Sequence, residues 1–318
     1  MAITRIYYYF CVLIMITAGT TTAQTAFRVI PLGVKGGSDE SNLSAYALAV
    51  KGTENYVCLD AGTLHAGIRK AIEANLFTGD PAAVLKTNIK GYLITHPHLD
   101  HLSGLIINSP DDGPKPIYAL PFCLNAFRDK YFTWQTWGNF TNEGEKPQLG
   151  KYHYVPLAIG KETPLEQTDL HVRPFFLSHT GPNLSTAFLI RHGDNHILYL
   201  GDTGPDAIEK SNALQQLWKE VAPLVKSKKL RAIFMEVSFA NEQSDHLLFG
   251  HLTPRHLMTE MAVLAQYAGT EPLKGLPVVI THIKPAPGRE QAIRTQLDHL
   301  NTLKLNIIIP QQATPLDF

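Results

Sequence analysis

The sequence has little cysteine and no excess of charge of either sign. Three cysteines in 318 residues argue against a disulfide scaffold, and a chain of this length buries enough surface to fold without one. The 28 basic residues balance the 28 acidic ones, whereas a protein that covers long nucleic acid needs a basic surface. Histidine, by contrast, occurs 14 times. Any bound metal would therefore be held by imidazole and carboxylate groups.

The N-terminal segment has the layout of a secretory signal peptide. A positive start, Met1–Arg5, precedes an apolar run, Ile6–Ile16, and Thr21-Thr22-Ala23 offers a cleavage site of small residues. The apolar run falls short of the roughly 20 residues that span a bilayer, which disfavours an uncleaved anchor. We therefore expect residues 1–23 to be removed, residues 24–318 to form one catalytic domain, and the protein to be periplasmic or secreted, with no membrane attachment thereafter.

Two cysteines, Cys58 and Cys123, remain after removal of the signal. Both have apolar neighbours in sequence, which favours small buried thiols over a disulfide, although an oxidising compartment leaves the disulfide open.

Short apolar runs rich in β-formers alternate with helical patterns along the mature chain, which favours an α/β fold of sheets flanked by helices. Strands are predicted over 27–34, 45–51, 56–59, 89–94, 171–177, 187–191, 196–200, 231–235, 277–280 and 306–309. Helices are predicted over 66–74, 101–108, 213–225, 254–267 and 289–303. In the fourth helix Thr253 is the expected N-cap and Pro254 the first helical residue.

Five predicted strands run into a metal-competent or acidic residue. Sites in α/β sheets form where strands end and loops begin, so this regularity predicts one shared site. The five residues are His96, His179, Asp202, Glu236 and His282.

The strongest motif is His96-Pro97-His98-Leu99-Asp100-His101. In an extended segment His96 and His98 point to the same side and can hold one ion, while a turn brings Asp100 and His101 to a second. His179, Asp202 and His282 would complete the two sites, with Asp202 as the bridging carboxylate. Two ions about 3.5–4 Å apart suit in-line displacement at phosphorus. Imidazole with carboxylate suits Zn²⁺, and Mn²⁺ or Fe²⁺ are admissible.

These residues resemble the metallo-β-lactamase superfamily, whose His-x-His-x-Asp-His motif and later His, Asp and His form a two-metal site. The stretch from His96 to Pro110 is similar, more narrowly, to the signature of class II 3′,5′-cyclic nucleotide phosphodiesterases. The resemblance implies a four-layer αββα sandwich. It also implies hydrolysis of cAMP, with cGMP open, to a nucleoside 5′-monophosphate by hydroxide that two metal ions generate.

The resemblance also implies roles for residues outside the ligand set. Asp60 matches a position behind the metals that hydrogen-bonds ligands, or else is a plain turn residue. Glu236 and His251 are similar to a Glu and a His that act together in RNA-processing phosphodiesterases; alternatively, His251 is an ordinary loop residue. The leaving 3′ oxygen needs a proton, which His251 or Asp100 would provide.

Several alternatives stay open at this point. An exported metallo-β-lactamase shares the scaffold, but lactam hydrolysis needs no carboxylate that bridges two metals. Another phosphodiesterase of the superfamily, a tRNA-processing enzyme, or an inactive zinc-binding envelope protein would also retain parts of the pattern; export and zero net charge disfavour the tRNA-processing enzyme. The aromatic segment Tyr131–Phe140 would stack on a purine or belong to the core. The sequence does not distinguish a monomer from a homodimer.

Overall fold

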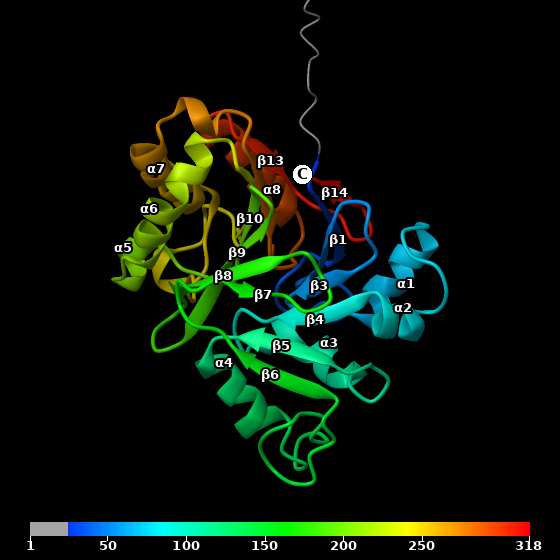
Figure 1. The fold of residues 1–318 in the computed structure, drawn as a ribbon. Helices are drawn as coiled ribbons and strands as arrows, with labels where there is room; N and C mark the ends of the chain where they lie inside the picture. The colour runs from blue at the N-terminus through cyan, green and yellow to red at the C-terminus, as the bar shows by residue number, and fades with distance from the viewer. Residues whose placement is uncertain (1–24) are drawn as a thin grey trace, which may run out of the picture.

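The computed structural model describes residues 25–318, which form two facing seven-stranded sheets (Figure 1). The predicted signal peptide lies outside the described residues. The first sheet has the order β14 (Leu316–Asp317), β1 (Phe27–Gly33), β2 (Ala45–Val50), β3 (Tyr56–Leu59), β4 (Ile89–Leu93), β5 (Lys115–Ala119) and β6 (Tyr152–Pro156). The second has the order β13 (Asn306–Ile308), β12 (Pro277–Thr281), β11 (Leu230–Glu236), β10 (Asn195–Leu200), β9 (Leu184–His192), β8 (His171–Ser178) and β7 (Thr163–Pro164).

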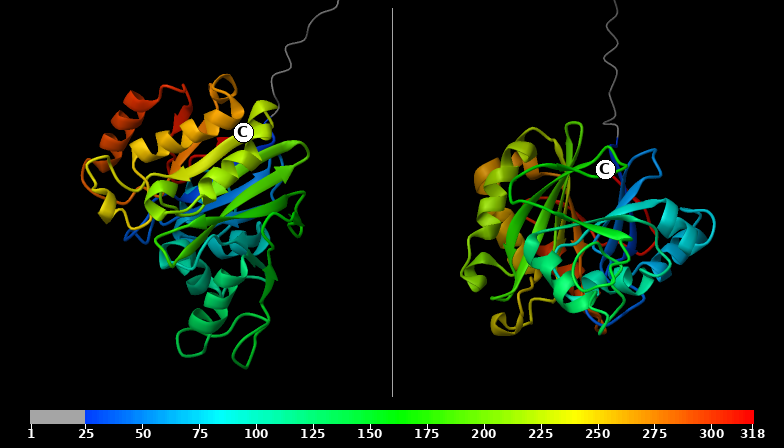
Figure 2. Two further views of the ribbon diagram at one scale, coloured as in Figure 1. Left: turned by 90° about the vertical axis from the view of Figure 1, so that its left-hand side faces the viewer. Right: turned by 60° about the horizontal axis from the view of Figure 1, so that its bottom comes forward.

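Helices cover the outer face of each sheet, so that the molecule has four layers (Figure 2). The first sheet is covered by α1 (His65–Glu73), α2 (Pro81–Thr87), α3 (Leu99–Asn108) and α4 (Pro121–Ala126), which a π-helical turn (Phe127–Tyr131) extends. The second is covered by α6 (Ala213–Lys226), α7 (Pro254–Ala268) and α8 (Arg289–Leu300). The remaining short elements are α5 (Asp206–Glu209) and the 3₁₀ turns Asp245–Leu247 and Glu271–Leu273.

Side chains from both sheets meet in the central layer. Tyr46 of β2 packs edge-on against Tyr199 of β10 and Phe234 of β11, with ring centroids 5.8 and 5.6 Å apart. The opposite faces of the same strands pack against the helices. Burial on both faces explains why so many strands are almost continuously apolar.

The predicted elements are all present, with ends that differ by up to three residues. The segments that form β5, β6, β7, β14, α2, α4 and α5 were not predicted, nor were the π-helical and 3₁₀ turns. Helix α3 begins at Leu99, two residues earlier than expected. Thr253 occupies the N-cap position of α7, but its hydroxyl contacts His256 Nδ1 at 3.0 Å instead of capping a backbone N–H.

Cys58 and Cys123 are buried free thiols, which confirms the first of the two interpretations. Burial raises the pKa of Cys58 to about 12, so the thiol stays protonated and unreactive. Within residues 25–318 no helix is both long and apolar enough to cross a bilayer.

The topology gathers several strand ends at one edge. Strand β8 is antiparallel to β9, which is antiparallel to β10, and β10, β11 and β12 are parallel. Strands β8, β10, β11 and β12 therefore run in the same direction, and their carboxyl ends lie side by side. Loops that follow these strands meet the loop after β4 from the other sheet.

Candidate metal centre

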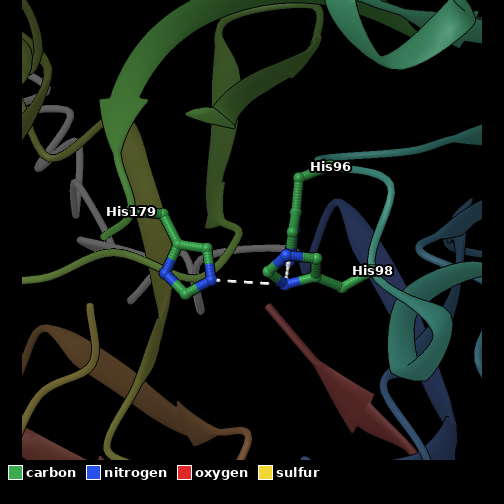
Figure 3. A group of neighbouring side chains, drawn as sticks. All are labelled: His96, His98 and His179. Carbon is green, nitrogen blue, oxygen red and sulfur yellow. Dashed lines mark hydrogen bonds between the residues drawn. The ribbon is translucent and has the colours of Figure 1, made fainter. Parts of the chain in front are cut away.

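The structure brings all seven predicted ligands together between the two sheets. They form two groups of three residues, within each of which the ligand atoms lie no more than 4.8 Å apart, and Asp202 lies between the groups. The first group is His96, His98 and His179, shown in Figure 3; the second is Asp100, His101 and His282.

The first group consists of three imidazoles. His98 Nδ1 lies 3.1 Å from His96 Nε2 and 3.4 Å from His179 Nε2, so the three rings point at one position (Figure 3). The loop after β4 carries two of them, and His179 directly follows β8. Burial lowers the pKa of all three, that of His179 to about 4. They are therefore neutral at pH 7, which is the form that binds metal.

The second group combines one carboxylate with two imidazoles. Because α3 begins at Leu99, Asp100 and His101 both lie in its first turn. Asp100 Oδ2 lies 3.1 Å from His282 Nε2 and accepts a 2.9 Å hydrogen bond from the Gly37 N–H. The His101 and His282 rings stack at 5.0 Å.

Asp202 connects the two groups. Its Oδ1 lies 3.3 Å from His101 Nε2, and its Oδ2 lies 3.2 Å from His282 Nε2 and 3.9 Å from His96 Nε2. Burial opposes ionisation of Asp202, but the charges of His282 and His101 outweigh it and hold the pKa of Asp202 well below its usual value. A buried, ionised carboxylate between two sets of donors has the geometry of a bridging ligand.

The outward nitrogens of four histidines are held by hydrogen bonds, as second-sphere partners of metal ligands usually are. This fixes which nitrogen faces the centre. His101 Nε2 is buried there without a hydrogen-bond partner, although it contacts Asp202. The donor set therefore fits metal ions. The four pairs are His101 Nδ1 with Asp60 at 2.8 Å, His179 Nδ1 with Gly250 O at 2.9 Å, His282 Nδ1 with Ser238 Oγ at 2.9 Å, and His96 Nδ1 with Thr95 Oγ1 at 3.0 Å.

Asp60 is entirely buried behind the centre and is not a plain turn residue. Besides His101, its carboxylate accepts hydrogen bonds from the Thr95 N–H and the Tyr199 hydroxyl, both at 2.9 Å. Residues from both sheets thus converge on one carboxylate that orients a predicted ligand.

Glu236 and His251 form a buried pair at the edge of the centre. His251 Nδ1 donates to Glu236 Oε1 at 2.7 Å and lies 3.7 Å from Asp202 Oδ2, and the His251 ring stacks on His282 at 5.1 Å. Burial lowers the pKa of His251, but the adjacent Glu236 carboxylate outweighs burial and raises it above its usual value. His251 therefore belongs to the centre, and the ordinary-loop interpretation is wrong.

The aromatic segment Tyr131–Phe140 mostly packs against the first helical layer. Phe132 is entirely buried, the Tyr131 hydroxyl donates to Pro97 O at 2.7 Å, and Trp137 Nε1 donates to Ser109 Oγ at 3.0 Å. This arrangement agrees with the core interpretation and supports the ligand-bearing loop from outside.

Two features of the centre were not predicted from the sequence. Ser238 Oγ donates to Glu236 Oε2 at 2.6 Å and also contacts His282 Nδ1. Ser238 thereby connects the Glu236–His251 pair to the predicted ligand His282. Gly36 packs against His282 so closely that a Cβ on it would lie 2.1 Å from the ring. The Gly36-Gly37 pair just beyond a strand was the available signal for this close approach.

Comparisons with known proteins agree with this geometry. Residues 80–313 match the family model of class-II cAMP phosphodiesterases. A 3′,5′-cyclic-nucleotide phosphodiesterase of Aliivibrio fischeri is 41% identical, over 92% of this chain and 93% of that protein. Unliganded yeast PDE1 superimposes with a TM-score of 0.81 at 23% identity, over 92% of this chain and all of that one. The metallo-β-lactamase fold protein YhfI of Bacillus subtilis gives 0.60 at 16% identity, over 92% and 99%. The predicted αββα sandwich is therefore confirmed.

Proposed function

The chain belongs to the class-II cAMP phosphodiesterases, and we propose that it hydrolyses 3′,5′-cyclic nucleotides, cAMP first, to nucleoside 5′-monophosphates with two divalent metal ions. The proposal rests on the position of Asp202, which lies between the two ligand groups and contacts histidines of both. Family membership confirms the predicted resemblance and the hydrolase class.

The ligand set supports a pair of metal ions. His96, His98 and His179 would hold one ion, Asp100, His101 and His282 the other, and Asp202 both. Nitrogen and carboxylate donors suit Zn²⁺ first, with Mn²⁺ or Fe²⁺ as substitutes. Two bound ions would lower the pKa of an attacking water and neutralise charge on the phosphoryl oxygens.

The departing 3′ oxygen needs a proton, and His251 is the group that we assign to this step. Its Nδ1–H is engaged by Glu236, so its Nε2 is the nitrogen that can deliver a proton to the leaving oxygen. The raised pKa of His251 favours the protonated form. Asp100 was the other candidate. Burial opposes its ionisation, but His101 and His282 keep its pKa well below its usual value, so Asp100 is an ionised ligand and a poor acid.

The alternative functions lack support of this kind. A β-lactamase has no need for the shared carboxylate, and a structural zinc site would be a closed four-coordinate cluster, not two groups joined by Asp202. We further propose that residues 1–23 direct export and that the mature enzyme acts outside the cytoplasm.

The proposal is tested with purified residues 24–318, cAMP, cGMP and nitrocefin, with and without added Zn²⁺. We expect metal-dependent formation of 5′-AMP from cAMP and no hydrolysis of nitrocefin. Hydrolysis of nitrocefin with no turnover of either cyclic nucleotide would contradict it.

A further inference from the structure

Phe249 combines a costly backbone conformation with an exposed aromatic ring. Its φ is 53°, in the left-handed region that bulky side chains rarely adopt, and 59% of its surface is exposed. Burial of the ring therefore does not compensate for the backbone strain. Strain of this kind concentrates at functional sites, where the surrounding structure holds it in place.

The segment around Phe249 borders the first ligand group. The next residue, Gly250, accepts the 2.9 Å hydrogen bond from His179 Nδ1, and a Cβ on Gly250 would lie 2.5 Å from the Thr180 nitrogen. The backbone at residue 250 is thus pressed against the end of β8. Phe249 is one residue away, so its backbone adjoins the first ligand group.

The loop that carries Phe249 is held rigidly by its own contacts. Leu248 is buried, Asn241 Oδ1 accepts from the Arg255 N–H at 2.9 Å, and Gln243 Nε2 donates to Leu247 O at 2.8 Å. Asp245 forms a salt bridge with Arg255 at the start of α7. These contacts tie the loop to itself and to the start of α7.

A second exposed apolar side chain belongs to the ligand motif itself. Leu99 lies between His98 and Asp100 and is 60% exposed. Leu99 adjoins His98 in the chain, and Phe249 adjoins Gly250, whose carbonyl bonds His179, so both residues border the first ligand group. At the other end, Lys284 follows His282 by two residues and places its ammonium over the Phe239 ring at 5.5 Å. Two exposed apolar side chains thus adjoin the first ligand group, and a lysine adjoins His282 of the second.

We propose that Phe249 and Leu99 form the platform for the nucleobase, with the ring of Phe249 stacked on a purine. This inference rests on the proposed function, because a cyclic nucleotide is a flat apolar base joined to an anionic phosphate. The phosphate would lie at the metal centre and the base would extend over these two side chains. Stacking tolerates different bases, so adenine and guanine would both bind.

The test compares cAMP with the 3′,5′-cyclic phosphate of methyl β-D-ribofuranoside, which has the same reacting group and no base. The variant Phe249→Asn keeps a side chain that tolerates the left-handed conformation but lacks the ring. We expect it to raise KM for cAMP about tenfold, the usual worth of one stacked aromatic, with kcat unchanged. The abasic substrate should be hydrolysed as by the wild type. Phe249→Trp, which keeps an aromatic ring, should have the wild-type KM for cAMP. The control Leu247→Asn, on the same loop, should leave KM and kcat unchanged.

Two results would overturn the platform: a wild-type KM for cAMP in Phe249→Asn, or equal losses on the two substrates, which would mean that the loop acts through the metal centre. Failure of the wild-type enzyme to hydrolyse cAMP would instead overturn the proposed function, and the platform with it. Melting temperatures are measured in parallel, and Phe249→Asn should not fall below the wild type, since it relieves strain.

Discussion

Glu236 Oε1 lies 2.7 Å from His251 Nδ1, and both side chains are buried at the edge of the metal centre. The carboxylate also accepts hydrogen bonds from the Thr203 N–H at 3.1 Å and from Ser238 Oγ at 2.6 Å. Glu236 therefore fixes both the orientation and the tautomer of His251. The pair is built to hold a proton at the opposite nitrogen of the ring.

The variant His251→Ala should keep its metal but lower kcat for cAMP by roughly 10²–10⁴, the usual worth of a proton donor. The loss should be smaller for bis-p-nitrophenyl phosphate, because p-nitrophenolate leaves without a proton. Steady-state kinetics on both substrates and metal analysis test this, with His246→Ala, an exposed histidine, as control.

Equal losses on the two substrates would show that His251 holds the phosphate instead. Loss of metal from His251→Ala would make it a ligand, and an unchanged rate on cAMP would exclude any part in the reaction.

Asp60 should govern metal affinity without touching metal. The Asp60 carboxylate accepts from four groups, which are the Thr95 N–H and hydroxyl, the Tyr199 hydroxyl and His101 Nδ1. In Asp60→Asn an amide NH₂ replaces one acceptor oxygen, and the hydrogen bond to His101 is weakened. Changes of this kind cost about 10–100-fold in metal affinity. Titration against a competing chelator measures the change, and Asp80→Asn, at the exposed N-cap of α2, serves as the control. Unaltered affinity in Asp60→Asn would refute the role.

Gly36 should be intolerant of any side chain. A Cβ there would lie 2.1 Å from Cε1 of His282, so Gly36→Ala has to displace that ring or the loop. We expect loss of metal from the group of Asp100, His101 and His282, and with it loss of activity. In Gly113→Ala the new methyl meets only ordinary contacts from 3.6 Å outward, and the enzyme should behave as wild type. Full metal content in Gly36→Ala would show that the loop at residue 36 moves to accommodate the methyl group, which would contradict this prediction.

The proposed export of the protein can be tested at its N-terminus. If residues 1–23 are a cleaved signal, Edman sequencing of protein recovered outside the cytoplasm should begin at Gln24. An intact Met1 on a membrane-bound protein would contradict both the cleavage and the proposed location.

The grouping of the seven candidate ligands could be predicted because their signal is local. Four lie within six residues, and the other three follow apolar strands within two residues, so pattern and strand direction together define one edge. The strand at Lys115–Ala119 was missed because it begins with a lysine and a proline. Lys115 is nevertheless buried, since its ammonium pairs with Asp112 at 2.6 Å and donates to two carbonyls.

Contacts between the two sheets could not be predicted from the sequence. That Tyr199 reaches Asp60 depends on how β10 faces the first sheet, and no local pattern records this. The exposure of Phe249 is similar: a Leu-Leu-Phe run predicts burial, whereas the loop turns two of the three side chains outward. Local sequence indicates the candidate ligands, while tertiary packing specifies their hydrogen-bond partners.

The metal content of purified residues 24–318, determined together with cAMP hydrolysis for the wild type and Asp202→Ala, decides whether two metal ions share Asp202. We expect about two ions per wild-type chain, since the candidate ligand set is that of a two-metal site. We expect Asp202→Ala to lose metal and nearly all activity, because both ions would share this carboxylate. An active wild-type enzyme with one ion or none, or an Asp202→Ala variant with two ions and full activity, would contradict the two-metal proposal.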